Sequence, residues 1–123
     1  MADKQQIWTR DLTGADVLRL LLAAEAEIVP PNQRMASVFW PLVARWVMTG
    51  LVADGTLNRE VQQTWTRDLT GADVLRLARA FEAELVPPAR RMNPVFWPSV
   101  AEGVPIGLIL EGVIKYPPIE VEL

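Results

Sequence analysis

The stretch WTRDLTGADVLRL occurs twice in this chain, at residues 8–20 and again at residues 65–77. Residues 5–44 align with residues 62–101 in 40 pairs, of which ten differ and thirty are identical. A tandem repeat of this kind indicates one structural unit that buries its apolar face against its copy. The repeat therefore predicts a chain built from two similar units.

The two units fill nearly the whole chain. Beyond the forty aligned pairs the match weakens but continues, because Gly55 aligns with Gly112. We place the first unit at residues 1–58 and the second at residues 59–123, packed together as one compact domain. Two copies favour a closed pair about a pseudo-two-fold axis over an open solenoid. Such close identity is typical of a recent natural duplication, as in a phage protein, or of an engineered single-chain dimer, and the sequence leaves both origins open.

Each unit begins with features of a short strand and a capped helix. Ile7, Trp8 and Thr9 favour extended backbone, and so do their counterparts in the second unit. Thr13 is followed three residues later by Asp16, a variant of the capping box that begins helices. The Thr hydroxyl satisfies a free backbone N–H, and the Asp carboxylate suits the positive end of the helix dipole. Both units therefore predict a helix start at this point.

The helix after this cap is predicted to run to about Val29 in the first unit and to about Val86 in the second. Its apolar residues recur at spacings of three and four, which places them on one face. A double proline then ends each helix, because proline lacks the N–H that would continue it. Leu22 of the first copy is replaced by Arg79 in the second. We therefore expect Leu22 to be buried or at an interface, and Arg79 to be in water.

The second half of each unit is rich in proline. We expect Pro41 either to kink a helix or to occupy the first position of a new one. The second unit has three prolines between residues 94 and 105, which makes a long helix doubtful there. Asp54-Gly55 predicts a hairpin turn, and the alternating IEVEL at residues 119–123 is typical of an edge strand. The predicted fold class is α+β, mainly helical, with two tandem copies of a strand–helix–helix–hairpin unit related by a pseudo-two-fold axis.

Composition excludes several kinds of chemistry. The 123 residues include no His and no Cys. The chain therefore lacks the side chains for a disulfide, a thiolate nucleophile, a Ser–His–Asp triad or a zinc site of the usual kind. The net charge is −3, and without clustered Lys and Arg to neutralise phosphates we expect no nucleic-acid partner. We predict no cofactor and favour a non-enzymatic protein.

Two apolar stretches require comparison with membrane segments. Residues 36–53 contain Arg45 and a proline, and residues 95–114 contain two glutamates and two prolines. A spanning helix needs about 20 apolar residues with few charges, so we predict that neither stretch crosses a membrane. Contact with a membrane surface stays open. The first residues lack the apolar core of a signal peptide, so we expect a cytoplasmic location or one that the sequence does not determine.

The arginine and aspartate residues of the repeat have local explanations. Arg10-Asp11 and its copy are expected to form exposed pairs that contribute well under about 1 kcal/mol. Asp16 is expected to cap its helix. Arg19 lies three residues beyond Asp16, a spacing at which helical side chains pair. We therefore predict no functional role for these charges.

Four glutamates could support a metal site or acid–base chemistry, and they are Glu25, Glu27, Glu82 and Glu84. Glu25 and Glu27 are two residues apart on the predicted helix, so they do not share a face. Glu25 and Glu82 could meet at the pseudo-two-fold axis and hold a hard cation. Nothing in the spacing requires such a site, so we expect a solvated face and predict no metal or catalytic residues.

The aromatic residues are the better clues to function. Trp buries a large area and needs a partner for its N–H, so it is common at interfaces. Trp46 aligns with Gly103, which predicts that Trp46 packs across the two-fold axis or onto another chain. Arginines beside the apolar runs could form the rim of the same surface. The candidate interface or pocket residues are Leu22, Phe39, Trp40, Trp46, Phe96, Trp97, Arg34 and Arg91.

These observations favour a structural or assembly protein that acts by association with its own copies or with another protein. One alternative is a small-molecule enzyme or a hydrophobic-ligand pocket between the two copies, lined by Trp40, Trp46 and Trp97. The other alternative is a protein that lies on a membrane surface. The sequence alone leaves these alternatives open.

Overall fold

The computed structural model describes residues 5–117 and contains two similar units. In each unit a short strand, a helix, two short 3₁₀ turns, a second helix and another short strand follow one another. The first unit contains β1 (Ile7–Trp8), α1 (Gly14–Ile28), α2 (Trp40–Ala53) and β2 (Leu57–Asn58). The second contains β3 (Thr64–Trp65), α3 (Gly71–Leu85), α4 (Trp97–Leu110) and β4 (Ile114–Lys115). The chain is therefore a mainly helical α+β protein with an internal duplication, as predicted.

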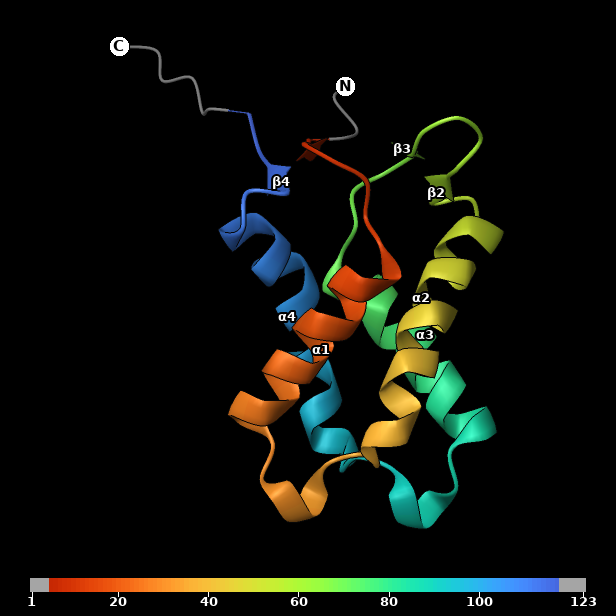
Figure 1. The fold of residues 1–123 in the computed structure, drawn as a ribbon, viewed down its shortest axis with the longest axis vertical. Helices are drawn as coiled ribbons and strands as arrows, with labels where there is room; N and C mark the ends of the chain where they lie inside the picture. Colours follow the sequence, from red (N-terminus) through yellow and green to blue (C-terminus); the bar gives the residue numbers. More distant parts are fainter. Residues whose placement is uncertain (1–4, 118–123) are drawn as a thin grey trace.

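The four helices pack around one core. Helix α1 contacts both α2 of its own unit and α4 of the other, and α3 contacts both α4 and α2. The strands lie at one end of the helices and the 3₁₀ turns at the opposite end (Figure 1). These turns are Pro31–Gln33 and Ser37–Phe39 in the first unit, and Pro88–Arg90 and Pro94–Phe96 in the second. Every helix therefore contacts one helix of each unit, which makes the two units a single core.

The predicted helix caps are confirmed in both units. The Thr13 hydroxyl accepts a hydrogen bond from the Asp16 backbone N–H at 3.2 Å, and the Asp16 carboxylate accepts one from the Thr13 N–H at 2.9 Å. Thr70 and Asp73 form the same capping box at the start of α3. Both helices end just before the double prolines, as their sequences require.

The proline-rich halves each form a continuous helix. Pro41 lies in the first turn of α2, where its missing N–H leaves no bond unmade. The doubt about a long helix in the second unit was wrong, because α4 spans fourteen residues with Pro105 inside it. Pro105 is buried together with its neighbour Val104. Packing of this apolar helix against α1 and α3 offsets the backbone hydrogen bond that Pro105 cannot make.

Both strand pairs join one unit to the other. Strand β1 pairs antiparallel with β4, with Ile7 opposite Lys115, and β2 pairs antiparallel with β3. The predicted hairpin turn at Asp54-Gly55 is therefore misplaced. Gly55, at φ +81°, instead turns the chain from α2 into β2. The hairpin that does form, β2–β3, crosses the boundary between the units, and the predicted edge strand at residues 119–123 lies outside the described residues.

Aromatic rings and glutamine side chains hold the two units together. Trp8 and Trp65 stack with ring centroids 4.3 Å apart and planes within 5° of parallel. The Gln6 side-chain amide donates to the Leu69 carbonyl at 2.7 Å and accepts from the Leu69 N–H at 2.8 Å. Gln63 makes the equivalent two bonds to the backbone before α1. Sequence reasoning missed these glutamines, because a polar residue just before a short strand carries no signal of what lies opposite it.

Candidate functional site

Glu25 and Glu82 are buried, so the solvated face predicted for them was wrong. Their exposed fractions are 5% and 7%. The Glu25 carboxylate accepts hydrogen bonds from the Trp40 indole at 3.1 Å and from the Met35 N–H at 3.0 Å. Glu82 accepts equivalent bonds, including one from the Trp97 indole at 3.0 Å. Each glutamate therefore ties the end of one helix to the start of the next within its own unit.

The surroundings of Glu25 favour a structural role. Burial raises the pKa of Glu25 above its ordinary value, and the hydrogen bonds from Met35 and Trp40 only partly oppose this effect. Glu27 and Glu84 are exposed, as predicted. Across residues 5–117 no cluster of three or more acidic side chains is placed to hold a metal ion. The glutamates are accounted for by the buried indole and amide donors that they satisfy.

Arg10 pairs with Asp16, and the predicted Arg10–Asp11 side-chain pair was wrong. The guanidinium donates to both carboxylate oxygens of Asp16, each at 2.8 Å. Arg19 donates to the same carboxylate at 3.1 Å, as its spacing predicted. The hydrogen bonds from Arg10 hold the pKa of Asp16 well below its ordinary range. In the second unit, Arg67 likewise donates to both carboxylate oxygens of Asp73. These charges therefore stabilise the starts of α1 and α3.

Two further ion pairs join the units at the strand end of the molecule. Arg19 of α1 pairs with Glu111, which follows α4. Arg76 of α3 pairs with Asp54, which follows α2, at 2.9 Å. All four side chains are at least partly exposed, so each pair contributes little free energy by itself. Their effect is to fix how each second helix ends beside the other unit's first helix.

The tryptophans named from the sequence lie in the core. Trp40 and Trp97 are fully buried, with ring centroids 5.6 Å apart. Trp46 packs edge-on against Phe81 of the second unit. Phe39 and Phe96 precede α2 and α4 and pack partly buried against the same core. These aromatic residues therefore contribute to the packing between and within the units.

Leu22, Arg34 and Arg91 lie at the surface or close to it. Leu22 is 38% exposed on α1, so the expectation that it is buried was wrong, and a role at an interface stays a prediction. Arg34 donates to the carbonyls of Val29 at 2.8 Å and Ala26 at 2.9 Å. Arg91 makes the same two bonds at the end of α3. Both arginines satisfy carbonyls that a helix end leaves without partners.

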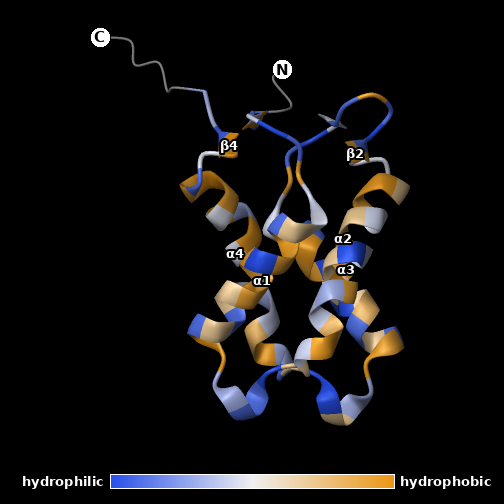
Figure 2. Ribbon diagram, viewed as in Figure 1, coloured by the Kyte–Doolittle hydropathy of each residue, from blue (hydrophilic) through white to orange (hydrophobic). Residues whose placement is uncertain are grey.

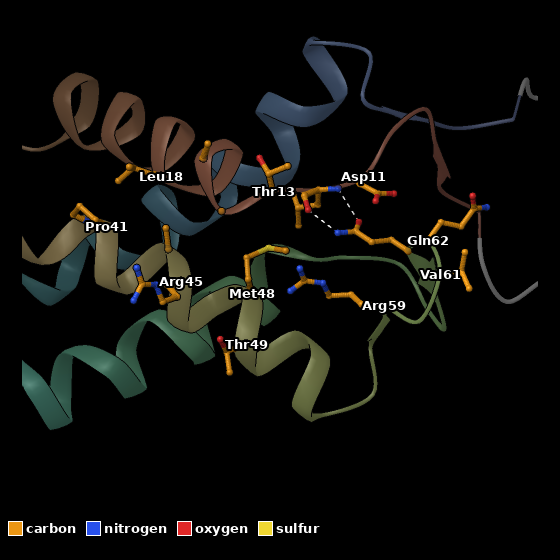
Figure 3. Close-up of a pocket in the computed structure, with 15 residues that line it drawn as sticks. Asp11, Thr13, Leu18, Pro41, Arg45, Met48, Thr49, Arg59, Val61 and Gln62 are labelled. Atoms are coloured by element: carbon orange, nitrogen blue, oxygen red, sulfur yellow. Dashed lines mark hydrogen bonds between the residues drawn. The ribbon is translucent and has the colours of Figure 1, made fainter.

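A groove of about 700 Å³ opens in the first unit beside the start of α1. It lies between α1 and α2 and is bordered by residues 59–63, which connect β2 to β3 (Figure 3). Apolar side chains, among them Leu18 and Met48, line its inner part. Arg45 of α2 and Arg59 of the connection lie at its edge, and Arg59 extends toward Met48 (Figure 3). Asp11 also borders the groove, so the rim carries two arginines and one carboxylate around an apolar floor.

The corresponding place in the second unit has the opposite charge. Arg45 aligns with Glu102, and Arg59 aligns with Tyr116. The Glu102 carboxylate lies directly over Gly71 at the start of α3, where it leaves no room for a β-carbon. In the first unit the equivalent space over Gly14 is open, with no atom within 4 Å of where a β-carbon would stand. The groove is thus basic in the first unit, and an acidic side chain fills its counterpart.

The outer face of α4, defined by Ile106, Ile109 and Leu110, is a second surface that distinguishes the units. The exposed fractions of these side chains are 50%, 39% and 82%. The aligned residues of α2 are Thr49, Val52 and Ala53. Figure 2 shows the last turn of α4 as strongly apolar. Because the opposite side of α4 lies in the core, the helix is apolar almost all round.

Comparison with known proteins adds no family, since no family model, curated protein or solved structure matches this chain. Among residues 5–117, no helix is both long enough and apolar enough to cross a membrane. The basic groove and the outer face of α4 are therefore the features from which a function can be argued.

Proposed function

We propose that this chain is a non-enzymatic assembly protein whose copies associate through the outer face of α4. The observation that carries this proposal is the exposed apolar row at Ile106, Ile109 and Leu110, on a helix whose other side is already buried. A helix that is apolar all round is normally covered on every side. Contiguous apolar surface on a folded chain marks an interaction site.

A second copy is a suitable partner because the face can meet itself across a two-fold axis. In such an isologous contact the same residues are used twice, so an apolar row is complementary to its own copy. Two charged residues flank the apolar row in the sequence, Glu102 before it and Glu111 after it. Arg19 already neutralises Glu111 through their ion pair, which lowers the repulsion between two approaching faces.

The duplication supplies a matched pair of variants for the test. Leu110→Glu places a charge in the apolar row, and Ala53→Glu places the same charge at the aligned position of α2. Sedimentation equilibrium over a wide concentration range measures self-association. We expect the parent chain to dimerise, Leu110→Glu to raise the dimer Kd by at least about tenfold, and Ala53→Glu to leave it unchanged.

Two results would contradict the proposal. One is a parent chain that stays monomeric up to several hundred micromolar, and the other is an equal effect of the two variants. Flotation with lipid vesicles provides a separate check of the same face. If the monomeric parent chain bound vesicles and Leu110→Glu did not, the face would be a membrane contact and the proposed assembly would be wrong.

A further inference from the structure

We infer that the basic groove of the first unit binds residues 118–123 of a second copy, so that chains can also join head to tail. The sequence of this segment is Pro-Ile-Glu-Val-Glu-Leu. The inference concerns a different surface from α4, although both would assemble copies of the same chain. It rests on the charge and shape of the groove and on the pattern of the segment.

The groove contains two arginines, Arg45 and Arg59, that form no ion pair with the described part of the chain. By contrast, Arg10, Arg19, Arg67 and Arg76 all take part in ion pairs. Arg guanidinium groups recognise carboxylates through two parallel hydrogen bonds. The N–H groups at the start of α1 add partial positive charge near the same opening. An occupant with carboxylates is therefore favoured.

The floor of the groove requires an occupant that is also apolar. Leu18 and Met48 line it, and Met adapts its shape to different apolar partners. In an extended segment, successive side chains point to opposite sides. Residues 119, 121 and 123 are Ile, Val and Leu, while residues 120 and 122 are both Glu. Such a segment would place its apolar set on the floor and its carboxylates at the rim, within reach of the long arginine side chains.

Charge and position separate the segment from the surface of its own unit. The described chain ends at Pro117, just beyond Tyr116, which aligns with Arg59 of the groove. The Tyr116 hydroxyl accepts a hydrogen bond from the Gln6 side chain at 3.1 Å. The surface of the second unit beside it carries Glu102 in place of Arg45, so an acidic segment would be repelled there. The described chain leaves β4 on one side of the strand end, whereas the β2–β3 connection that borders the basic groove lies on the other side (Figure 1). The occupant is therefore assigned to a second copy, whose groove can approach the segment from outside.

This arrangement has a consequence for assembly. The groove lies beside the start of α1 and the segment follows β4 in the sequence, so the contact uses two different surfaces. Contacts of this heterologous kind produce rings when the rotation closes and filaments when it does not. The isologous contact through α4 produces only pairs.

A peptide-binding measurement tests the inference. The receiver is the full chain carrying Glu120→Arg and Glu122→Arg, so that its own segment does not compete. The ligand is a fluorescein-labelled peptide of residues 116–123, Tyr-Pro-Pro-Ile-Glu-Val-Glu-Leu, with an amidated end.

Fluorescence anisotropy is expected to show saturable binding that weakens with added salt. In the same receiver, Arg45→Glu, which copies the second unit, should weaken binding by about tenfold or more. Arg79→Glu, on the exposed side of α3, should not.

A charge exchange makes the result specific. A receiver with Arg45→Glu and Arg59→Glu should regain binding to a peptide in which both glutamates are lysine. Chemical-shift changes at the Met48 methyl group on adding the original peptide would place the ligand in the groove. Absence of saturable binding, equal loss in Arg45→Glu and Arg79→Glu, or an unmoved Met48 signal would each overturn the inference. Leu110→Glu, which should weaken the α4 contact, should leave peptide binding to the receiver unchanged. This variant therefore distinguishes failure of the groove inference from failure of the proposed α4 contact.

Discussion

Trp46 of α2 packs edge-on against Phe81 of α3, with ring centroids 5.6 Å apart and ring planes at 65°. At the equivalent contact between α4 and α1, Gly103 faces Ala24. Two large residues therefore meet on one side of the pseudo-two-fold axis and two small residues on the other. Both partners differ between the copies, so each contact keeps a complementary shape although the units are otherwise nearly identical.

The first prediction concerns the tight contact between Gly103 and Ala24. A β-carbon at position 103 would stand 2.9 Å from the Ala24 β-carbon, which cannot move without its helix. Gly103→Ala should therefore destabilise the protein by about 1–3 kcal/mol, although Gly→Ala inside a helix normally stabilises. Urea unfolding measures the change. Gly14→Ala, with open space around it, is the control, and Ala24→Gly combined with Gly103→Ala should recover part of the loss.

The second prediction concerns the buried carboxylate of Glu25. Glu25→Ala would leave the Trp40 indole N–H and the Met35 N–H without their acceptor in the core. We expect a loss of about 3 kcal/mol in the free energy of unfolding. Glu27→Ala, two residues along the same helix and exposed, should change it by less than about 0.5 kcal/mol. Equal effects of the two variants in denaturant unfolding would rule out the role assigned to Glu25.

The third prediction is a dependence of stability on pH that comes from Asp16. Arg10 lowers the pKa of Asp16 in the folded chain below the ordinary value of 3.8. The unfolded chain therefore binds a proton at Asp16 before the folded chain does, so stability falls as the pH drops below about 4. Asp16→Asn should reduce stability near pH 7 and flatten this fall. The change is measured by thermal unfolding between pH 2.5 and 7, with the exposed Asp11→Asn as control; parallel curves for parent and Asp16→Asn would contradict it.

The fourth prediction is that the units depend on each other. Both strand pairs and the Trp8–Trp65 stack form between units, so one unit alone lacks a partner for each strand. Residues 1–58 and 59–123, produced as separate chains, should associate when mixed. The expected signal is the near-ultraviolet circular dichroism of the stacked indoles, present in the mixture and absent from either chain alone. The same signal in an unmixed monomeric chain would show that one unit suffices.

The fifth prediction concerns Leu22, which is 38% exposed. Leu22→Arg copies Arg79 of the second unit and should change the free energy of unfolding by less than about 1 kcal/mol, because the new charge remains in water. A drop of more than about 5 °C in Tm would show that this side of α1 is covered in the folded protein. A changed mass by light scattering without a changed Tm would support the prediction that Leu22 lies at an interface between chains.

Local sequence was a reliable guide where one short segment decides its own structure. The capping boxes at Thr13 and Thr70 and the ends of α1 and α3 depend on residues within a few positions of each other. The burial of Glu25 was missed although it lies four residues beyond Leu21 on the apolar face. The prediction treated Glu25 as exposed because it is charged. The hydrogen bond that compensates for its burial comes from the Trp40 indole, fifteen residues away in the sequence, which local patterns do not reveal.

The sequence by itself determined the duplication, the mainly helical class and the places where α1 and α3 begin and end. These follow from an exact repeat and from short-range capping and proline chemistry, which need no knowledge of distant residues. Only the tertiary structure decided that strands pair between units, that α4 stays helical through Pro105, and that the groove beside α1 is open and basic while Glu102 fills its counterpart. Each of these features depends on contacts between residues far apart in the chain. The contacts that stabilise them form only when the two units pack together.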